Sequence, residues 1–326
     1  MGNRKLWTGI GAFAGMLVLI LDGKTALQGA QTGVELCLRT VVPSMFPFFI
    51  LSILVTGTML GETYPLLTRI GRLFHIPKGT ASILIPAFLG GYPVGAQCIS
   101  QSFHAGQLNR SDAQRMLAFC NNAGPAFLFG MVGGIFPRRW MVWAIWGILL
   151  LSAWLVSLLY PCDTRETTLR PGSQVTISTA MASATRIMAS VCGWVVLFRV
   201  IIAFLNRWIL WAFPIPVQVA VTGILELSNG CCVLTAVTDT HLRFVLCTGI
   251  LSLGGVCVTL QTLSVTGSLS LKYYFIGKLL QTGFSIIMAV SLAYGFPFLP
   301  LLIFIPFLFC LRKKENSSSI PGILDV

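Results

Sequence analysis

Two short stretches interrupt long apolar segments with residues that disrupt helices. They are residues 90–95 (GGYPVG) and residues 121–125 (NNAGP), and weaker interruptions follow at 226–230 and 253–255. In lipid, an unpaired backbone N–H or C=O costs several kcal/mol, so such breaks persist only where they line a cavity or contact protein. Paired interruptions of this kind are the best sequence indication of a transporter's binding site. The pattern therefore predicts a protein that moves a small solute across a membrane.

The composition fits this prediction. The chain has 326 residues, of which 55% are hydrophobic and only 10% are charged, and its mean hydropathy is +0.83. Soluble domains carry about 25% charged residues, so the expected fold class is an all-α polytopic membrane protein with the lipid bilayer as its surroundings. The formal charge of +12 lies mostly between apolar segments rather than on one polar face, which argues against a nucleic-acid partner.

A membrane-spanning helix needs about 20 apolar residues. Spans are expected at residues 6–21, 34–60, 113–136, 140–160, 187–213, 244–264 and 273–294, with a short last one at 296–311. Segments 80–100 and 217–237 are split near their middles, and we interpret them as re-entrant hairpins that enter and leave on one side. Segment 6–21 resembles a signal peptide, but no clear cleavage site follows it, so an uncleaved first helix is favoured.

The distribution of basic residues favours a cytoplasmic N-terminus and a cytoplasmic C-terminus. With the N-terminus inside and neither hairpin crossing, most of the 22 Lys and Arg residues fall on the cytoplasmic side, and we count Lys272 and Lys278 among them. Arg138 and Arg139 would then lie outside, against the trend.

The order span, hairpin, broken span, span occurs twice after the first helix. The hairpin tips align at Gly95 and Gly230, and the broken spans align at Gly124 and Gly254. Each unit crosses the membrane three times, so the second copy is expected to be inverted, as in secondary transporters. The expected parts are an N-terminal helix and loop (1–33), a first repeat (34–160), a cytoplasmic linker (161–186), a second repeat (187–295), and a last short span with a flexible tail (296–326).

Neither an enzyme nor a metal site is expected. The ten cysteines lie mostly in apolar runs without C-x-x-C spacing, and the three histidines are scattered in polar loops. No nucleophile elbow, H-E-x-x-H pattern or Walker loop occurs. We therefore expect no cofactor, and the sequence leaves a homo-oligomer open.

The breaks supply the first candidate binding residues. Gly91, Pro93 and Gly95 suit a hairpin tip whose N–H groups point into a cavity, and the following half-helix, starting near Ala96, has a partial positive charge at its N-terminus. The alternative is a structural kink in a full span. The amides of Asn121 and Asn122 could line a cavity or hold neighbouring helices together.

Charged residues inside apolar segments are the second group. Glu226 is costly near a hairpin tip unless it is paired or hydrated. It could carry a proton, pair with Arg39 or Arg199, or cap the turn at Asn229. Arg39 and Arg199 are candidate counter-charges for an anion, but long Arg side chains also reach the interface easily. Gln97, Gln261 and Gln281 are weaker candidates for a cavity.

Four motifs carry a resemblance to a known family. Residues 43–49 (PSMFPFF), 91–96 (GYPVGA) and 119–127 (FCNNAGPAF), with the weaker 226–230 (ELSNG), resemble the YlbJ-like sporulation integral membrane proteins, within the wider nucleoside-recognition (Gate) domain group. The resemblance covers about residues 43–280. It implies a role in endospore formation and transport of dipicolinic acid from the mother cell toward the forespore. The wider group includes nucleoside and ferrous-iron carriers, so the cargo does not follow from the fold.

Two positions depart from the family pattern. Gln97 stands where the family leads us to expect a lysine, and Asn122 stands where Thr or Ser is usual. The leading hypothesis is a carrier of a small organic anion in a bacterial membrane, and the alternatives are a nucleoside carrier and a spore-assembly scaffold. The expected substrate-binding residues are Gly91, Tyr92, Pro93, Gly95, Ala96, Gln97, Asn121, Asn122, Gly124, Glu226, Ser228, Asn229, Arg39 and Arg199.

Overall fold

The computed structural model describes residues 2–59, 64–77, 79–160, 175–296, 298 and 300. Over these residues the chain is helical and contains no strand. Five of its helical segments are long and apolar enough to cross a membrane, namely Gly23–Met59, Arg139–Leu159, Ile177–Trp208, Thr240–Thr266 and Lys272–Tyr294. The expected all-α polytopic membrane protein is confirmed.

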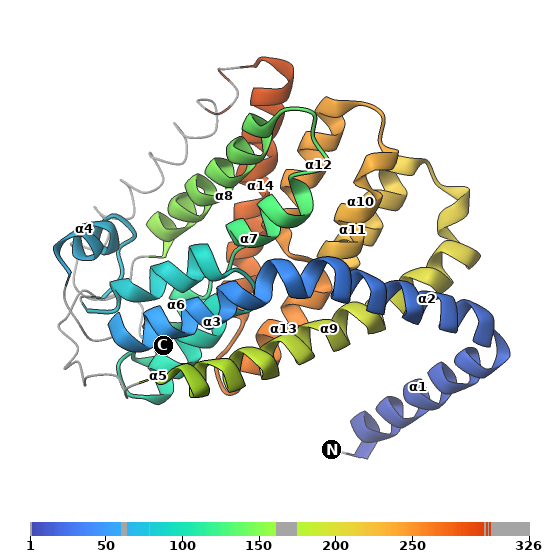
Figure 1. Cartoon of the computed structure of the whole chain (residues 1–326), viewed down its shortest axis with the longest axis horizontal. Helices are drawn as coiled ribbons and strands as arrows, with labels where there is room; N and C mark the ends of the chain where they lie inside the picture. Colours follow the sequence, from blue (N-terminus) through green and yellow to red (C-terminus); the bar gives the residue numbers. More distant parts are fainter. Residues whose placement is uncertain are drawn as a thin grey trace, which may run out of the picture.

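The first helix, α1 (Gly2–Leu21), stands apart from the body of the molecule (Figure 1). Asp22 ends it and accepts a hydrogen bond from the backbone N–H of Thr25 at 3.3 Å, which caps the next helix. Large apolar side chains of α1 are exposed, among them Trp7 and Ile20. Such a surface suits contact with lipid.

The next helix is continuous from α2 (Gly23–Leu36) through the π-turn η1 (Cys37–Val41) to α3 (Val42–Met59). The sequence predicted a loop up to residue 33, so that boundary is corrected. The loop was expected because residues 23–33 are polar and glycine-rich. They are helical because small residues allow close helix contact: a Cβ atom on Gly33 would lie 3.0 Å from the Cα atom of Val196.

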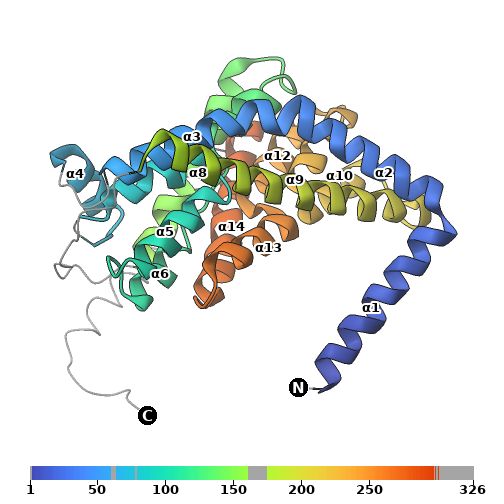
Figure 2. The same cartoon turned by 60° about the horizontal axis from the view of Figure 1, so that its bottom comes forward.

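The partner of this helix is α9 (Ile177–Trp208), which runs beside it in the opposite direction (Figure 2). Gly29 lies against Val200 near one end and Gly57 lies against Val175 near the other. A capping box between Thr176 and Thr179 starts α9 inside the expected linker 161–186. At 37 residues the first long helix measures about 56 Å, well beyond the roughly 30 Å hydrocarbon core, so it must tilt or extend past the membrane.

The first hairpin follows α4 (Pro65–Leu73) and contains η2 (Ala81–Ile83), η3 (Pro86–Gly90) and α5 (Val94–His104). A Cβ atom on Gly95 would lie 3.1 Å from the Cα atom of Ala87, so the chain doubles back at residues 91–93. The chain therefore turns back on itself where the sequence predicted a hairpin, and the second helix starts slightly before the expected Ala96. That the hairpin enters and leaves the membrane on one side stays a prediction.

The first broken span runs through α6 (Arg110–Met116), α7 (Pro125–Phe127) and η4 (Leu128–Val132). Residues 121–124 between α6 and α7 are not helical. The predicted unwinding before Pro125 is confirmed, because proline lacks an N–H and clashes with the preceding turn of a helix.

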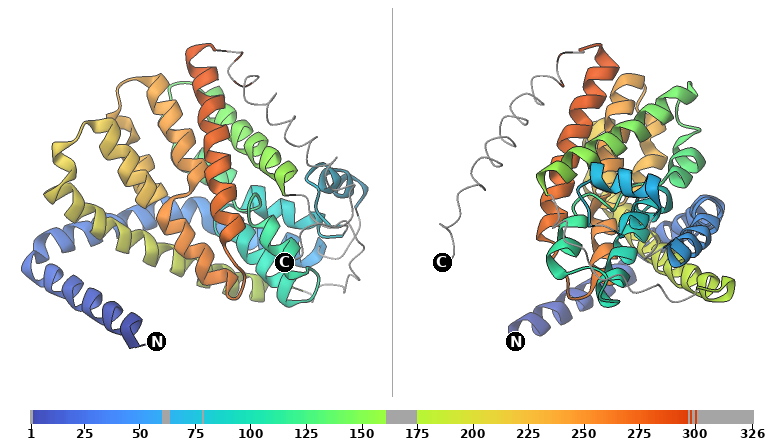
Figure 3. Two further views of the ribbon diagram at one scale, coloured as in Figure 1. Left: turned by 180° about the vertical axis from the view of Figure 1, so that it is seen from behind. Right: turned by 90° about the vertical axis from the view of Figure 1, so that its left-hand side faces the viewer.

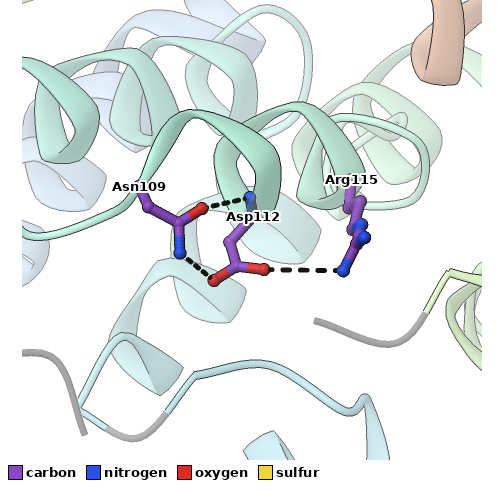
Figure 4. A network of polar contacts seen from close by, with 3 residues as sticks. All are labelled: Asn109, Asp112 and Arg115. Atoms are coloured by element: carbon purple, nitrogen blue, oxygen red, sulfur yellow. Dashed lines mark hydrogen bonds and ion pairs between the residues drawn. The ribbon is translucent and has the colours of Figure 1, made fainter. Parts of the chain in front are cut away.

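A polar cluster fixes the start of α6 (Figure 4). Asn109 accepts a hydrogen bond from the backbone N–H of Asp112 at 2.7 Å, and its amide donates to the Asp112 carboxylate at 2.6 Å. Arg115 lies 4.0 Å from the same carboxylate. These contacts hold the short helix that leads into the break.

The second half has the same order of elements. The turn η5 (Leu210–Ala212) follows α9, and then come the hairpin α10 (Ile215–Leu225) and α11 (Leu227–Val233), the turn η6 (Leu234–Ala236), and the broken span α12 (Thr240–Leu253) and α13 (Gly255–Thr266). A Cβ atom on Gly230 would collide with Gly223, so α10 and α11 pack side by side as a helical hairpin, whose re-entrant course in the membrane stays a prediction.

Each half ends in a long helix: α8 (Arg139–Leu159) in the first and α14 (Lys272–Tyr294) in the second. Figure 3 shows α14 beside α8 and α12, which it contacts. The matching order and the antiparallel long helices agree with an inverted repeat, whose exact symmetry stays a prediction. Residues 161–174 of the expected linker and the expected span at 296–311 with its tail lie outside the described residues, apart from positions 296, 298 and 300.

Candidate functional site

The two breaks within each half contact each other through their backbones. Gly91 has φ +82°, and a Cβ atom there would lie 3.0 Å from the backbone N of Gly124. In the second half, Gly255 has φ +80°, and a Cβ atom there would lie 2.8 Å from the carbonyl oxygen of Ile224. Only glycine permits both the backbone conformation and the close approach at these points. Hairpin and broken span are therefore held together in each half.

The two halves meet at Tyr92, next to the first hairpin's turn. Its hydroxyl donates a hydrogen bond to the carbonyl oxygen of Leu251 at 3.2 Å, just before the second break. A Cβ atom on Gly254 would lie 3.0 Å from the Tyr92 ring. The break of one half therefore packs against that of the other, although they are far apart in sequence.

A small cavity lies at this meeting point. Its volume is about 20 Å³, room for one water molecule but not for an organic solute. Both long helices, both hairpins and both broken spans line it: Val41, Met45, Tyr92, Ala123, Gly124, Phe127, Val191, Val195, Glu226, Leu227, Ser228, Val258 and Gln261. In this conformation the candidate site has no room for an organic cargo.

Glu226 lies in the cavity wall and is only 2% exposed. Its Oε2 atom accepts hydrogen bonds from the backbone N–H and the side-chain amide of Asn229, each at 2.7 Å. Glu226 is thus the N-cap of α11, which was one of the alternatives that the sequence left open. The described residues contain no ion pair to it.

The expected counter-charges lie elsewhere. Arg39 forms an ion pair with Glu35 at 3.1 Å, and both side chains are largely exposed. Arg199 is half-buried where α2 crosses α9, next to Gly33. Neither arginine lines the small cavity, and their role as counter-charges stays a prediction. Arg39 lies in η1 and Arg199 in α9, outside the hairpins and broken spans that contain the breaks.

The two asparagines bind protein groups. The amide of Asn121 donates to the hydroxyl of Thr262 at 2.9 Å, and the amide of Asn122 donates to the carbonyl oxygen of Phe119 at 2.6 Å. Both side chains are buried, and neither lines the cavity. In this conformation they hold the unwound segment in place.

The other expected residues occupy the turns. Pro93, Gly95 and Ala96 are buried at the start of α5, and Ser228 and Asn229 are buried at the start of α11. Gln97 instead faces a larger pocket of about 550 Å³ between α5, α9 and α13, with Gln101, Arg186 and Val265.

A second large pocket, of about 410 Å³, is lined by Arg138 and His241. It lies at the start of α12, whereas the Gln97 pocket reaches the end of α13. The two large pockets therefore lie at opposite ends of the broken span, with the small cavity between them.

The strongest polar feature at the meeting point was not predicted. Lys278 on α14 is only 3% exposed, and its Nζ atom donates to the Tyr92 hydroxyl at 2.9 Å, to Gln281 Oε1 at 2.9 Å and to Asn122 Oδ1 at 3.3 Å. The charge pattern of the sequence groups Lys278 with the cytoplasmic residues, whereas its side chain is buried inside the fold. A lysine inside an apolar span could have identified it as a functional residue, because charged side chains are rare there and usually have a function.

The comparisons with known proteins support the resemblance seen in the motifs. The chain is similar to the sporulation integral membrane protein YlbJ of Bacillus subtilis (strain 168), with 24% identity over 318 aligned positions, which cover 81% of this chain and 76% of that protein. No family model matches the chain, so the Gate-domain part of the resemblance is not confirmed. No solved structure matches it either.

Proposed function

We propose that this protein is a secondary carrier or facilitator of a small organic anion in a bacterial membrane, acting during endospore formation. The observation that carries the proposal is that the breaks of the two halves meet beside one small cavity, whose mainly apolar wall includes the buried polar residues Tyr92, Glu226 and Ser228. Broken helices that meet between two halves are how secondary transporters build their binding sites.

The charge at the meeting point favours an anionic cargo. Lys278 does not line the cavity itself, but it is buried beside Tyr92, which does, and the partners described for its Nζ atom are all neutral oxygens. A buried cation without a carboxylate partner attracts an anion strongly in a medium of low dielectric constant. The resemblance to the YlbJ-like family points to dipicolinate, a dicarboxylate. We also propose that the protein resides in the membranes around the developing spore and that both of its termini lie in the cytoplasm.

One observation favours a second cargo. Glu226 lies in the cavity wall, and a carboxylate there could accept hydrogen bonds from the hydroxyl groups of a ribose. A nucleoside carrier is therefore the alternative. A membrane scaffold for spore assembly is the third candidate, and it predicts no transport at all.

Uptake into proteoliposomes tests the three candidates together. The purified protein is reconstituted, and entry of dipicolinate is compared with entry of nucleosides, with and without a proton gradient. We expect saturable dipicolinate uptake above that of protein-free vesicles. Uptake of nucleosides alone would favour the second candidate, and uptake of neither would favour the scaffold.

A further inference from the structure

The surroundings of the Lys278 ammonium resemble a site for a metal cation. Four oxygens surround Nζ: the Tyr92 hydroxyl at 2.9 Å, Gln281 Oε1 at 2.9 Å, Asn122 Oδ1 at 3.3 Å and the carbonyl oxygen of Ser252 at 3.4 Å. An ammonium group has only three N–H donors, so four oxygens exceed what one lysine can saturate. We call these four groups the oxygen cage.

The four oxygens come from four separate parts of the fold. Tyr92 belongs to the first hairpin's turn, Asn122 to the unwound segment before α7, and Gln281 to α14. The carbonyl of Ser252 belongs to the last turn of α12, just before the break at Gly254. The C-terminal end of a helix carries partial negative charge, and such ends of broken helices coordinate cations in secondary transporters.

Hydrogen bonds to neighbouring groups orient the Tyr92 and Gln281 oxygens of the cage toward Nζ. The Tyr92 hydroxyl donates its own proton to the carbonyl of Leu251, which leaves its lone pairs for Nζ. The Gln281 amide donates to Asn122 Oδ1 at 2.7 Å and to the carbonyl of Leu149 at 3.3 Å, so its oxygen faces Nζ. The cage therefore has its own support, apart from the lysine.

We propose that the Lys278 ammonium occupies a monovalent-cation site, and that the protein carries covalently the positive charge that a Na⁺ ion would otherwise supply there. All four oxygens are neutral, which suits a single positive charge better than a divalent ion. The wild-type protein then needs no Na⁺ at this position. Shortening the side chain leaves an empty cage that Na⁺ can enter. The consequence that transport would not be coupled to Na⁺ at this position rests on the proposed function, whereas the cation site itself does not.

The test measures ion binding without any transported solute. Wild-type protein, Lys278→Ala and Lys278→Met are extracted and purified in parallel in sodium chloride and in choline chloride of equal ionic strength. Thermal unfolding is then followed as Na⁺ replaces choline. Lys278→Met is the matched control, because it removes the charge but keeps a side chain of similar length inside the cage.

We expect the unfolding midpoint of Lys278→Ala to rise with Na⁺, by about 2 °C or more for each tenfold increase above the dissociation constant. The wild-type protein and Lys278→Met should show no such rise. Recovery of folded Lys278→Ala in sodium but not in choline would also support the proposal. The proposal is overturned if Na⁺ raises the unfolding midpoint of the wild-type protein equally, or if it does not change the midpoint of Lys278→Ala. It is also overturned if folded Lys278→Ala is recovered in neither salt.

Discussion

Gly91 joins the first hairpin to the first broken span. Its φ of +82° is unfavourable for any residue with a side chain, and a Cβ atom would lie 3.0 Å from the backbone N of Gly124. We expect Gly91→Ala to lower the free energy of unfolding by about 1–3 kcal/mol, from strain and lost contact.

Chemical or thermal unfolding of the purified variant measures this effect. The matched control is Gly147→Ala on α8, where nothing lies within 4 Å of the added methyl group. That change should leave stability nearly unaltered or raise it slightly, since alanine favours a helix. Equal effects from the two substitutions would refute the role assigned to Gly91.

Glu226 combines a structural task with a place in the cavity wall. Glu226→Gln keeps an oxygen that can accept both hydrogen bonds from Asn229, so the fold should survive within about 1 kcal/mol. Glu226→Ala removes the cap of α11 and should cost about 1–2 kcal/mol. Thermal unfolding of the two variants separates the contribution of the hydrogen-bonded N-cap from that of the negative charge. If Glu226→Gln is as unstable as Glu226→Ala, the charge of Glu226 rather than its hydrogen bonds stabilises the turn.

The crossing of α2 and α9 is the largest contact between the two long helices. Gly33→Leu should destabilise the protein by about 1–3 kcal/mol, because the added side chain would meet Val196 and Arg199. Gly193→Leu on α9 is the control, since nothing lies within 4 Å of that glycine. Unfolding midpoints of the two variants in the same detergent decide the matter, and indistinguishable midpoints would contradict the packing described.

The elements that the sequence predicts correctly are those determined by residues within the element itself. Proline and glycine within apolar segments located both hairpins and the break before Pro125, because these residues exclude a regular helix by themselves. Residues 23–33 were misjudged because their helix depends on glycines that pack against α9, a contact that no local pattern reveals. Helix ends at 177 and 94 likewise depend on caps and turns.

The candidate site was predictable in part for the same reason. Tyr92, Gly124, Glu226 and Ser228 lie at the breaks and line the small cavity, whereas their binding of a substrate stays a prediction. Lys278 was missed because a lysine six residues into a span reads equally well as a flanking charge. Only the approach of α14 to both breaks distinguishes the two interpretations.

The described part of the molecule has a small cavity between two larger pockets at opposite ends of α12 and α13. If the topology inferred from the charges is correct, the pocket with Gln101 faces the cytoplasm and the pocket with His241 faces the other side. Single cysteines introduced at these two positions, in a cysteine-free background, should react with a membrane-impermeant maleimide from opposite sides of oriented vesicles. Labelling of both from one side would contradict the topology.

The central claim is that the breaks of the two halves form a carrier site, and dipicolinate uptake by a cavity variant tests it most directly. Ser228 lines the cavity, so Ser228→Leu should fill it and reduce initial uptake by roughly tenfold or more in proteoliposomes. Wild-type protein and the control Gly193→Leu, which changes an exposed position of α9 with open space around it, should both take up the dicarboxylate well above protein-free vesicles. The account is contradicted if folded Ser228→Leu transports as fast as wild type, or if wild-type vesicles take up no more than empty ones.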